Sequence, residues 1–314
     1  MIFRAIAPLS AAVILFGFCF LRNIGEVSRP KLDIRSVIYS TLAFGGLLYG
    51  FSAAGSYGWL SAMTIGPLIV GVVVLVVYIR RQLAIDQPLL NLRVLKSSIF
   101  THATILAMIV NAALIAGTVI FPIYLQDVMH YTALTSGLIM MPGAIVMGIM
   151  SPISGVLFDR FGPRTLSLVG LVIMILTTGS FCFLSMNWSI FALCAVFCVR
   201  TFGMSMINMP INTWGINALD NQVVAHGNAI NNTARQIAGS IGTAIMVTVM
   251  TTTTAARTPI EGAVQGMLDG MNAAFAFATV LAVIAFVIAF FKVHDDEAAI
   301  ARREAAKMKK SLSE

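Results

Sequence analysis

The residues of this sequence best suited to chemistry are charged groups that interrupt long apolar stretches. The densest group lies at residues 155–164, which read GVLFDRFGPR between two apolar runs. Asp159 precedes the second run, where a carboxylate favours the positive end of a helix. Arg160 and Arg164 indicate that the turn lies on the cytoplasmic side of a membrane, because short basic loops stay on that side. The chemistry that such a turn offers is electrostatic rather than catalytic.

Two further charges lie inside apolar runs rather than between them. Arg200 is in the middle of the run at 188–209, and Arg235 is one to two turns into the run at 229–251. An ionisable residue inside a membrane span is costly, so each arginine is a candidate functional residue. Neither run contains an acid, so each arginine needs an acceptor on another helix, a backbone carbonyl or a water-filled cavity. If the second run begins later than we place it, Arg235 instead extends from the helix end to water.

Uncharged polar residues in the apolar runs are further candidates. Asn231 and Asn232 precede Arg235, and Asn111 lies near the middle of the run at 99–123. Asn111 would either contact a ligand in a central cavity or bond to a neighbouring helix, which is the commoner outcome. We expect Asp127, beyond the end of the same run, to be a solvated acid rather than a proton carrier.

The composition is that of a membrane protein built from helices. Of the 314 residues, 58% are hydrophobic and 11% are charged, and the mean hydropathy is +0.90. A soluble domain carries about a quarter charged residues. The net charge of +7 comes from loops and the C-terminal tail, so it does not indicate nucleic-acid binding. The four cysteines all lie in apolar runs, and we expect them to be packing residues and no metal site to be present.

The apolar runs predict an all-α integral membrane protein of about nine transmembrane helices. Each run has about the twenty residues that cross ~30 Å at 1.5 Å per residue, whereas barrel strands would be about half as long. The sequence contains no GxxxxGK[ST] loop, which argues against an ATP-driven pump. The nine runs are 5–21, 35–54, 60–79, 99–123, 134–156, 165–185, 188–209, 229–251 and 271–292.

Basic residues are concentrated in alternate loops. Residues 22–35 carry four, residues 80–96 carry four, and the tail at 293–314 carries more, while the loops between these are poor in basic residues. This predicts a multi-pass plasma-membrane protein with a cytoplasmic C-terminus. Nine spans would then put the N-terminus outside, although Arg4 precedes the first run. The simplest account is that an odd number of preceding spans is absent from this sequence.

The turn also matches a longer pattern, G-x-L-x-D-R-x-G-x-R. Gly162 allows a left-handed turn, and Pro163 suits the first position of a helix, but an ordinary basic hairpin does not need this order of residues. The spacing resembles the signature loop of the major facilitator superfamily of transporters. The resemblance implies that the loop biases the balance between inward-open and outward-open states, without touching the substrate. Its residues are Gly155, Leu157, Asp159, Arg160, Gly162 and Arg164.

Along nearly its whole length the chain resembles the fourteen-span drug/proton antiporters of that superfamily. Residues 40–50, 88–96 and 147–155 look closest to the lincomycin-resistance type of Gram-positive bacteria. The resemblance predicts that five spans are missing and divides the chain into four parts. These are the last span of an N-terminal bundle at 1–21, two linker spans and an interfacial segment at 22–97, a C-terminal six-span bundle at 98–292 and a basic tail at 293–314.

The interfacial segment is predicted from a three-residue repeat. Leu89, Leu92 and Leu95 recur every three residues, with Arg93 and Lys96 beside them. This pattern favours a short helix on the cytoplasmic interface, and a plain loop is the alternative.

The resemblance also suggests roles for the intramembrane arginines. Arg200 resembles the family arginine of an R-x-x-x-G pattern that is linked to proton coupling, but Gly203 falls one residue early here. A structural role is therefore the alternative. Gly239 and Gly242, close to Arg235, allow close helix packing. This segment lacks the Gly-Pro pair of the family's antiporter motif, so we do not assign that motif to it.

The implied function is part of a proton-coupled exporter, not an enzyme. Its expected partners are hydrophobic or cationic drugs, protons and membrane lipid, with a proton gradient as the energy source and no bound cofactor. Such proteins rock two bundles about a site near the bilayer midplane, so we expect no export from this chain alone. The first alternative is a non-transporting membrane partner or regulatory fragment on the same scaffold. A channel is a weaker alternative, because no ring of carboxylates or filter-like loop is evident.

Overall fold

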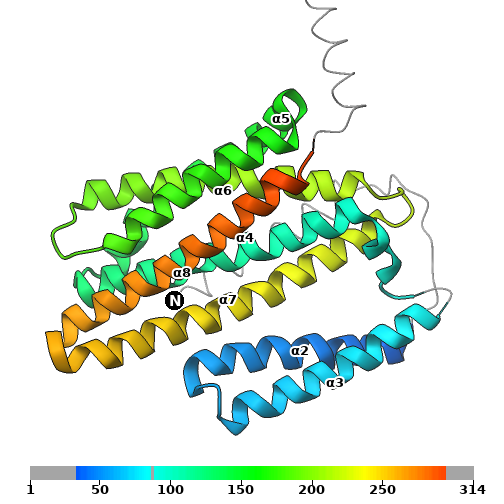
Figure 1. Ribbon diagram of the computed structural model, residues 1–314, viewed down its shortest axis with the longest axis horizontal. Coiled ribbons are helices and arrows are strands. Elements are labelled where there is room, and N and C mark those ends of the chain that lie inside the picture. Colours follow the sequence, from blue (N-terminus) through cyan, green and yellow to red (C-terminus); the bar gives the residue numbers. More distant parts are fainter. Residues whose placement is uncertain (1–32, 86–87, 295–314) are drawn as a thin grey trace, which may run out of the picture. The chain divides into compact units, whose positions relative to one another are not determined.

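The computed structural model describes residues 33–85 and 88–294. The predicted span at 5–21 and most of the predicted tail lie outside these ranges. Every helix described below belongs to one compact unit, Ile34–Glu314. Figure 1 shows these helices lying alongside one another, with no strand in this part of the chain. The all-α prediction is therefore confirmed for the described residues.

Seven helices in the described part of the chain are long and apolar enough to cross a membrane. Each predicted span between 35 and 292 lies inside one of them or extends beyond it by no more than two residues, and the total of nine stays a prediction. The helices are α2 (Ile34–Tyr57), α3 (Ala62–Ala84), α4 (Ser98–Ile123), α5 (Ala133–Ser180), α6 (Ile190–Asn217), α7 (Val224–Glu261) and α8 (Ala263–Lys292).

The first half of α5 runs parallel to α6. Gly143 lies against Phe197, and Gly155 lies against Met209. The second contact is twelve residues later than the first on both helices. This half ends at Gly162, whose φ of 82° and ψ of 169° are non-helical. That region of backbone space is accessible essentially only to glycine, so the residue marks a true break.

Beyond Gly162 the second half of α5 runs antiparallel to α6. Gly170 lies against the backbone of Gly203, and Thr178 bonds to Arg200, so contacts move backwards along α6. The chain therefore reverses at residues 160–164. The single label α5 covers two helices, which correspond to the predicted spans 134–156 and 165–185.

The connection between α7 and α8 differs from the prediction. Residues 252–270 are rich in threonine and were expected to form a loop, but α7 continues to Glu261 and α8 starts at Ala263. Only Gly262, with φ 90°, separates the two helices. Hydropathy marks the thickness of the apolar layer rather than the end of a helix. Threonine can remain helical by bonding to the preceding turn, as Thr252 does to the carbonyl of Thr248 at 2.7 Å.

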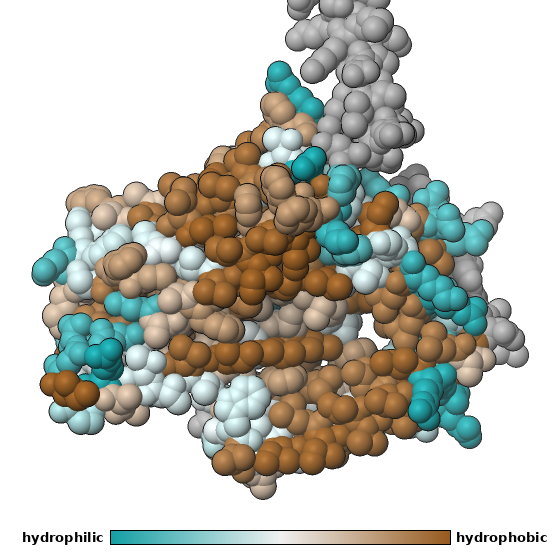
Figure 2. Space-filling model, in the orientation of Figure 1, coloured by the Kyte–Doolittle hydropathy of each residue, from teal (hydrophilic) through white to brown (hydrophobic). Residues whose placement is uncertain are grey.

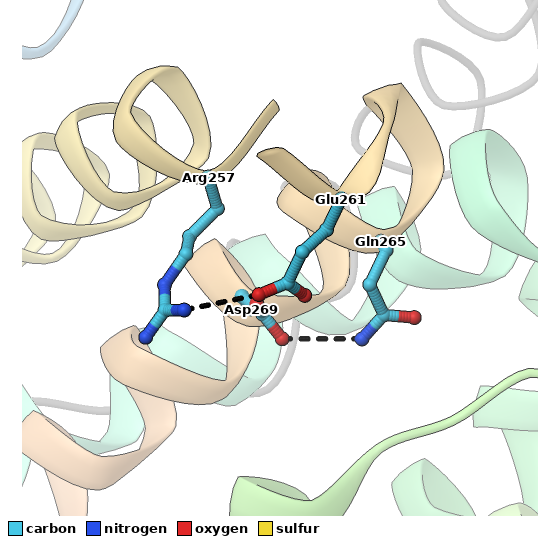
Figure 3. A network of polar contacts seen from close by, with 4 residues as sticks. All are labelled: Arg257, Glu261, Gln265 and Asp269. Atoms are coloured by element: carbon cyan, nitrogen blue, oxygen red, sulfur yellow. Dashed lines mark hydrogen bonds and ion pairs between the residues drawn. The ribbon is translucent and has the colours of Figure 1, made fainter. Parts of the chain in front are cut away.

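Polar side chains flank this connection in both helices. In α7, Arg257 pairs with Glu261 at 3.0 Å. In α8, the amide of Gln265 donates to Asp269 at 3.2 Å. Figure 3 shows the four residues on either side of the turn. Pairs four positions apart support a helix surface by a few tenths of a kcal/mol each, so they help both helices to persist to Gly262.

Residues 88–97, with Arg93 and Lys96, and residues 160–164, with Arg160 and Arg164, lie at one end of the helices, which we call the basic end. Part of 88–97 lines a pocket of about 280 Å³ there together with part of 218–223, which contains no Lys or Arg. At the same end, Nη2 of Arg164 donates to the carbonyl of Phe290 at 3.5 Å, and its guanidinium lies 5.7 Å from the ring centre of that residue. Basic residues that are far apart in the sequence therefore lie at the same end of the helices.

Connections poor in basic residues meet at the opposite end. The hydroxyl of Tyr124 donates to the carbonyl of Ser185 at 2.7 Å, and Leu184 exchanges two hydrogen bonds with Asn272. On the face drawn in Figure 2, apolar side chains occupy the middle of the helices and hydrophilic ones gather toward the ends. This distribution is that of a protein whose helices cross a bilayer.

Helices α2 and α3 form a hairpin held by glycines. A β-carbon added to Gly46 would lie 2.9 Å from the carbonyl oxygen of Pro67 and 3.0 Å from Cα of Gly71. The hairpin packs against α7, where the indole of Trp59 donates to Thr248 at 2.7 Å. The hairpin therefore adds to the other helices through α7.

The predicted interfacial segment forms one short helix at the basic end. It is a 3₁₀ helix at Leu92–Lys96, capped by Asn91. With three residues per turn, Leu92 and Leu95 fall on one face, whereas Leu89 precedes the helix. Leu89 and Leu95 are 38% and 42% exposed. The location of this segment on a membrane surface stays a prediction.

Candidate functional site

Five polar residues from three helices meet between the middle of α4 and the basic end of α6 and α7. We call this group the polar seam. Asn111 of α4, at the middle of its helix, belongs to it, as does Arg235, about three turns into α7. The full set is Asn111, Asn208, Asn212, Asn231 and Arg235.

Side-chain hydrogen bonds connect α6 to α7 in the seam. Arg235 donates from Nη2 to Oδ1 of Asn208 at 3.1 Å, and Asn231 donates from Nδ2 to Oδ1 of Asn212 at 2.9 Å. The two pairs are one helical turn apart on each helix, as expected for antiparallel helices. Because arginine has no acceptor, the oxygen of Asn208 must face it.

A third bond attaches the seam to α4. Nδ2 of Asn111 donates to the backbone carbonyl of Arg235 at 2.7 Å. Of the two outcomes foreseen for Asn111, the structure shows the bond to a neighbouring helix. The close approach depends on small residues, because a β-carbon at Gly242 would lie 2.8 Å from Ala112, and one at Gly239 would lie 2.9 Å from Nδ2 of Asn111.

The seam is partly open rather than sealed. Asn208, Asn212 and Arg235 are each partly exposed, while Asn231 is only 1% exposed. Within the described part of the chain, Oδ1 of Asn231 is buried without a hydrogen-bond partner. Asn232, the other predicted member, is exposed on a different side of α7 and makes none of these bonds. The seam can therefore offer hydrogen bonds to a solute.

The structure shows where Arg235 lies on its helix, and both predicted alternatives for it stay predictions, because they depend on where the membrane-spanning part of α7 begins. Helix α7 begins earlier than predicted, at Val224, so Arg235 does not lie at its end. It bonds across to Asn208 of α6. A functional role for Arg235 stays a prediction.

Arg200 lies apart from the seam and is completely buried, at 0% exposure. Its Nη2 lies 3.1 Å from the carbonyl of Leu114 and 3.4 Å from that of Ala113, and its Nε donates to Thr178 at 3.3 Å. These contacts connect α6 to α4 and to the second half of α5. The guanidinium rests on the bare Cα of Gly117. The Nη1 group has no acceptor among the described residues.

The surroundings of Arg200 favour the structural alternative. Its acceptors are neutral carbonyl and hydroxyl groups, and a buried charge that loses its acceptors is strongly destabilising. Next to it, Gly203 allows α6 to cross α5 closely, because a β-carbon there would lie 2.8 Å from Ile173. A coupling role for Arg200 stays a prediction.

The signature turn lies at the basic end, and its first residue, Gly155, is at the level of Met209. Asp159 and Arg160 are exposed, and the guanidinium of Arg160 lies 5.3 Å from the ring centre of Phe161. Gly155 lies against the side chain of Met209, and Leu157 is partly buried. This arrangement leaves the charged groups accessible at the surface, where another segment could pair with them.

Asn208 and Asn212 are the site residues that sequence analysis missed. They lie four positions apart on α6, as Asn231 and Arg235 do on α7. That matched spacing on neighbouring runs was the available signal. It has meaning only when the two helices are known to be antiparallel and adjacent, and amides are common in apolar helices for packing.

The chemistry of the site is recognition rather than bond making. The described residues contain no group of three His, Cys, Asp or Glu side chains that could hold a metal ion. The seam consists of amides and a guanidinium, which bind by hydrogen bonds and charge. Neither carries the thiol, hydroxyl or imidazole of a nucleophile and base pair.

Comparison with known proteins matches residues 1–243 to the family model described as Major Facilitator Superfamily. The uncharacterized MFS-type transporter YhcA of Bacillus subtilis (strain 168) is 42% identical over 239 residues, covering 76% of this chain and 45% of that protein. The lincomycin resistance protein LmrB of the same strain is 38% identical over 242 residues, covering 76% and 50%. LmrB of Listeria monocytogenes serovar 1/2a (strain ATCC BAA-679 / EGD-e) is 36% identical over 240 residues. The chain spans about half the length of the curated relatives it matches.

Proposed function

Because the chain belongs to the Major Facilitator Superfamily, we propose that its helices form part of a proton-coupled exporter of hydrophobic or cationic drugs. The polar seam is the observation that carries this proposal. It places accessible hydrogen-bonding groups inside apolar helices, from the level of Asn111 at the middle of α4 toward the basic end, and such transporters bind their solutes near mid-depth. The relatives named for lincomycin resistance support a drug as the substrate.

The proposed mechanism is alternating access about the seam. The helices described here would supply one wall of the solute site, and a second bundle would supply the other. Neutral or positive groups line this wall, so an acidic proton carrier would belong to the second bundle. Rocking of one bundle against the other would expose the seam first to one side of the membrane and then to the other.

The signature turn would stabilise one conformational state through a contact at the basic end. The side chain of Asp159 is exposed and has no hydrogen bond to the described residues, so a partner segment could pair with it in one state and release it in the other. A contact shifts a conformational equilibrium only if it differs between the two states. Asp159→Asn in the completed transporter should therefore slow export while leaving membrane insertion unchanged. Asp220→Asn, at an exposed acid of another connection at the basic end, is the matched control and should export normally.

Accumulation of a fluorescent cationic dye tests the function directly. The dye is measured in pump-deficient cells that express this chain alone or this chain completed by the N-terminal spans of a relative. We expect only the completed protein to lower dye accumulation, and a protonophore to abolish the effect. Export by the chain alone would contradict the two-bundle site. Export that survives the protonophore would contradict proton coupling.

A further inference from the structure

The polar seam presents hydrogen-bond donors in excess of acceptors. The oxygens of Asn208 and Asn212 accept bonds from α7, so their Nδ2 groups are directed elsewhere. Arg235 uses one N–H on Asn208, and its Nε and Nη1 groups have no acceptor among the described residues. All three side chains are partly exposed, so these donors can reach a ligand.

Among the described residues, no carboxylate pairs with the positive charge of the seam. Every carboxylate that the structure describes lies within two turns of the end of a helix or in a connection between helices, far from the level of Asn111. Arg235 hydrogen-bonds only to a neutral amide in this part of the chain. The described carboxylates are Asp33, Asp127, Asp159, Asp220, Glu261 and Asp269.

A guanidinium in an apolar layer binds a carboxylate better than any neutral group. It presents its N–H groups in a planar fork that fits two carboxylate oxygens, and the low dielectric strengthens the attraction. Arginine is rarely left without a partner inside a membrane span. The amide Nδ2 groups of Asn208 and Asn212 add neutral donors on the α6 side of the same charge.

We propose that the seam is a binding site for a carboxylate carried on an apolar compound, held by Arg235 with Asn208 beside it. This inference rests on the proposed transport function and defines one chemical class of its substrate. Compounds that combine an apolar body with a carboxylate, including zwitterions, are recognised at this wall.

Binding to the purified chain tests the site without requiring transport. The chain is placed in nanodiscs of zwitterionic phosphatidylcholine, so that no anionic lipid competes, and binding to empty nanodiscs is subtracted. The probes are 1-naphthaleneacetate and its neutral analogue 1-naphthaleneacetamide, which differ mainly in charge. We expect the carboxylate to bind about ten- to a hundredfold more tightly, as a charged hydrogen-bonded pair implies.

Four variants assign the preference to the seam. Arg235→Gln should abolish it, and Arg235→Lys should retain part of it, because the charge remains but the fork is lost. Asn208→Asp should also abolish it, since the new carboxylate would occupy the guanidinium and the helix contact would persist. Arg257→Gln is the control, because this arginine is exposed at the far end of α7 and should leave the preference unchanged.

Two results would overturn the proposal. One is equal affinity of the original chain for both probes. The other is a preference for the carboxylate that survives in Arg235→Gln. Failure of the dye experiment alongside a preserved carboxylate preference would reject the proposed exporter and leave the site. Dye export without a carboxylate preference would reject the carboxylate site and leave the proposed exporter.

Discussion

The guanidinium of Arg200 occupies the place beside α4 that a β-carbon at Gly117 would take. The two residues are 83 positions apart and form one fitted contact between α6 and α4. Gly117 provides the space, and Arg200 fills it and bonds to the carbonyls of Ala113 and Leu114. The arginine can be buried completely only because the facing residue has no side chain.

Gly117→Ala is therefore expected to destabilise the protein. The added methyl group would collide with the guanidinium, and overpacking of this kind costs about 1–3 kcal/mol. Thermal unfolding of the purified chain in detergent measures the loss. Gly45→Ala is the control, because nothing lies within 4 Å of a β-carbon there. Combining Gly117→Ala with Arg200→Met should recover part of the loss, and strict additivity of the two changes would contradict the contact.

Gly162→Ala should weaken the reversal within α5. Its φ of 82° and ψ of 169° are unfavourable for any residue with a β-carbon, at a cost of about 1–3 kcal/mol. The free energy of unfolding gives the magnitude. Gly148→Ala, at an open position earlier in α5, is the matched control and should be neutral or slightly stabilising. Equal stability of the two variants would mean that the chain does not reverse through this conformation.

Gly71→Leu should separate α2 from α3. A β-carbon at this position would lie 2.8 Å from the amide nitrogen of Leu47 and 3.1 Å from the carbonyl of Ala43, and backbone atoms cannot move aside as a flexible side chain can. Hydrogen–deuterium exchange of peptides from residues 34–84 should become faster, because the hairpin loses its contact. Gly66→Leu, at an open position of α3, should exchange like the original protein. Unchanged exchange in Gly71→Leu would remove the close-packed hairpin.

Cysteine labelling in intact cells tests which end faces the cytoplasm. In a version without native cysteines, Asp220→Cys is expected to react only with a membrane-permeant maleimide, because it lies at the basic end. Glu261→Cys, beside Gly262 at the opposite end, is expected to react also with an impermeant reagent. Reaction of Asp220→Cys with the impermeant reagent would invert the proposed topology.

Sequence reasoning reached the family and the helical membrane fold, and the comparisons confirm both. The break at Gly162 was also foreseen, because a glycine followed by proline between two apolar runs has few other conformations. Those features depend on local sequence and on the length of apolar runs. The predicted domain boundaries, the functional roles of the turn and of the arginines, and proton coupling stay predictions.

The extent of α7 and the composition of the seam were harder to predict. Threonines after residue 251 lowered the hydropathy without ending the helix, because each hydroxyl can bond within it. Asn208 and Asn212 became site residues only when α6 lay antiparallel to α7. Such pairings depend on tertiary arrangement, which a single sequence does not contain. Arg235 was identified because a charge in an apolar run is conspicuous by itself.

The one-residue junction at Gly262 holds the end of α7 next to the start of α8. Because only one residue separates the two helices, their adjoining ends must move together. Helix α7 carries Arg235, and α8 ends beside the signature turn through Phe290. The pair of helices therefore joins the polar seam to the charged surface at the basic end.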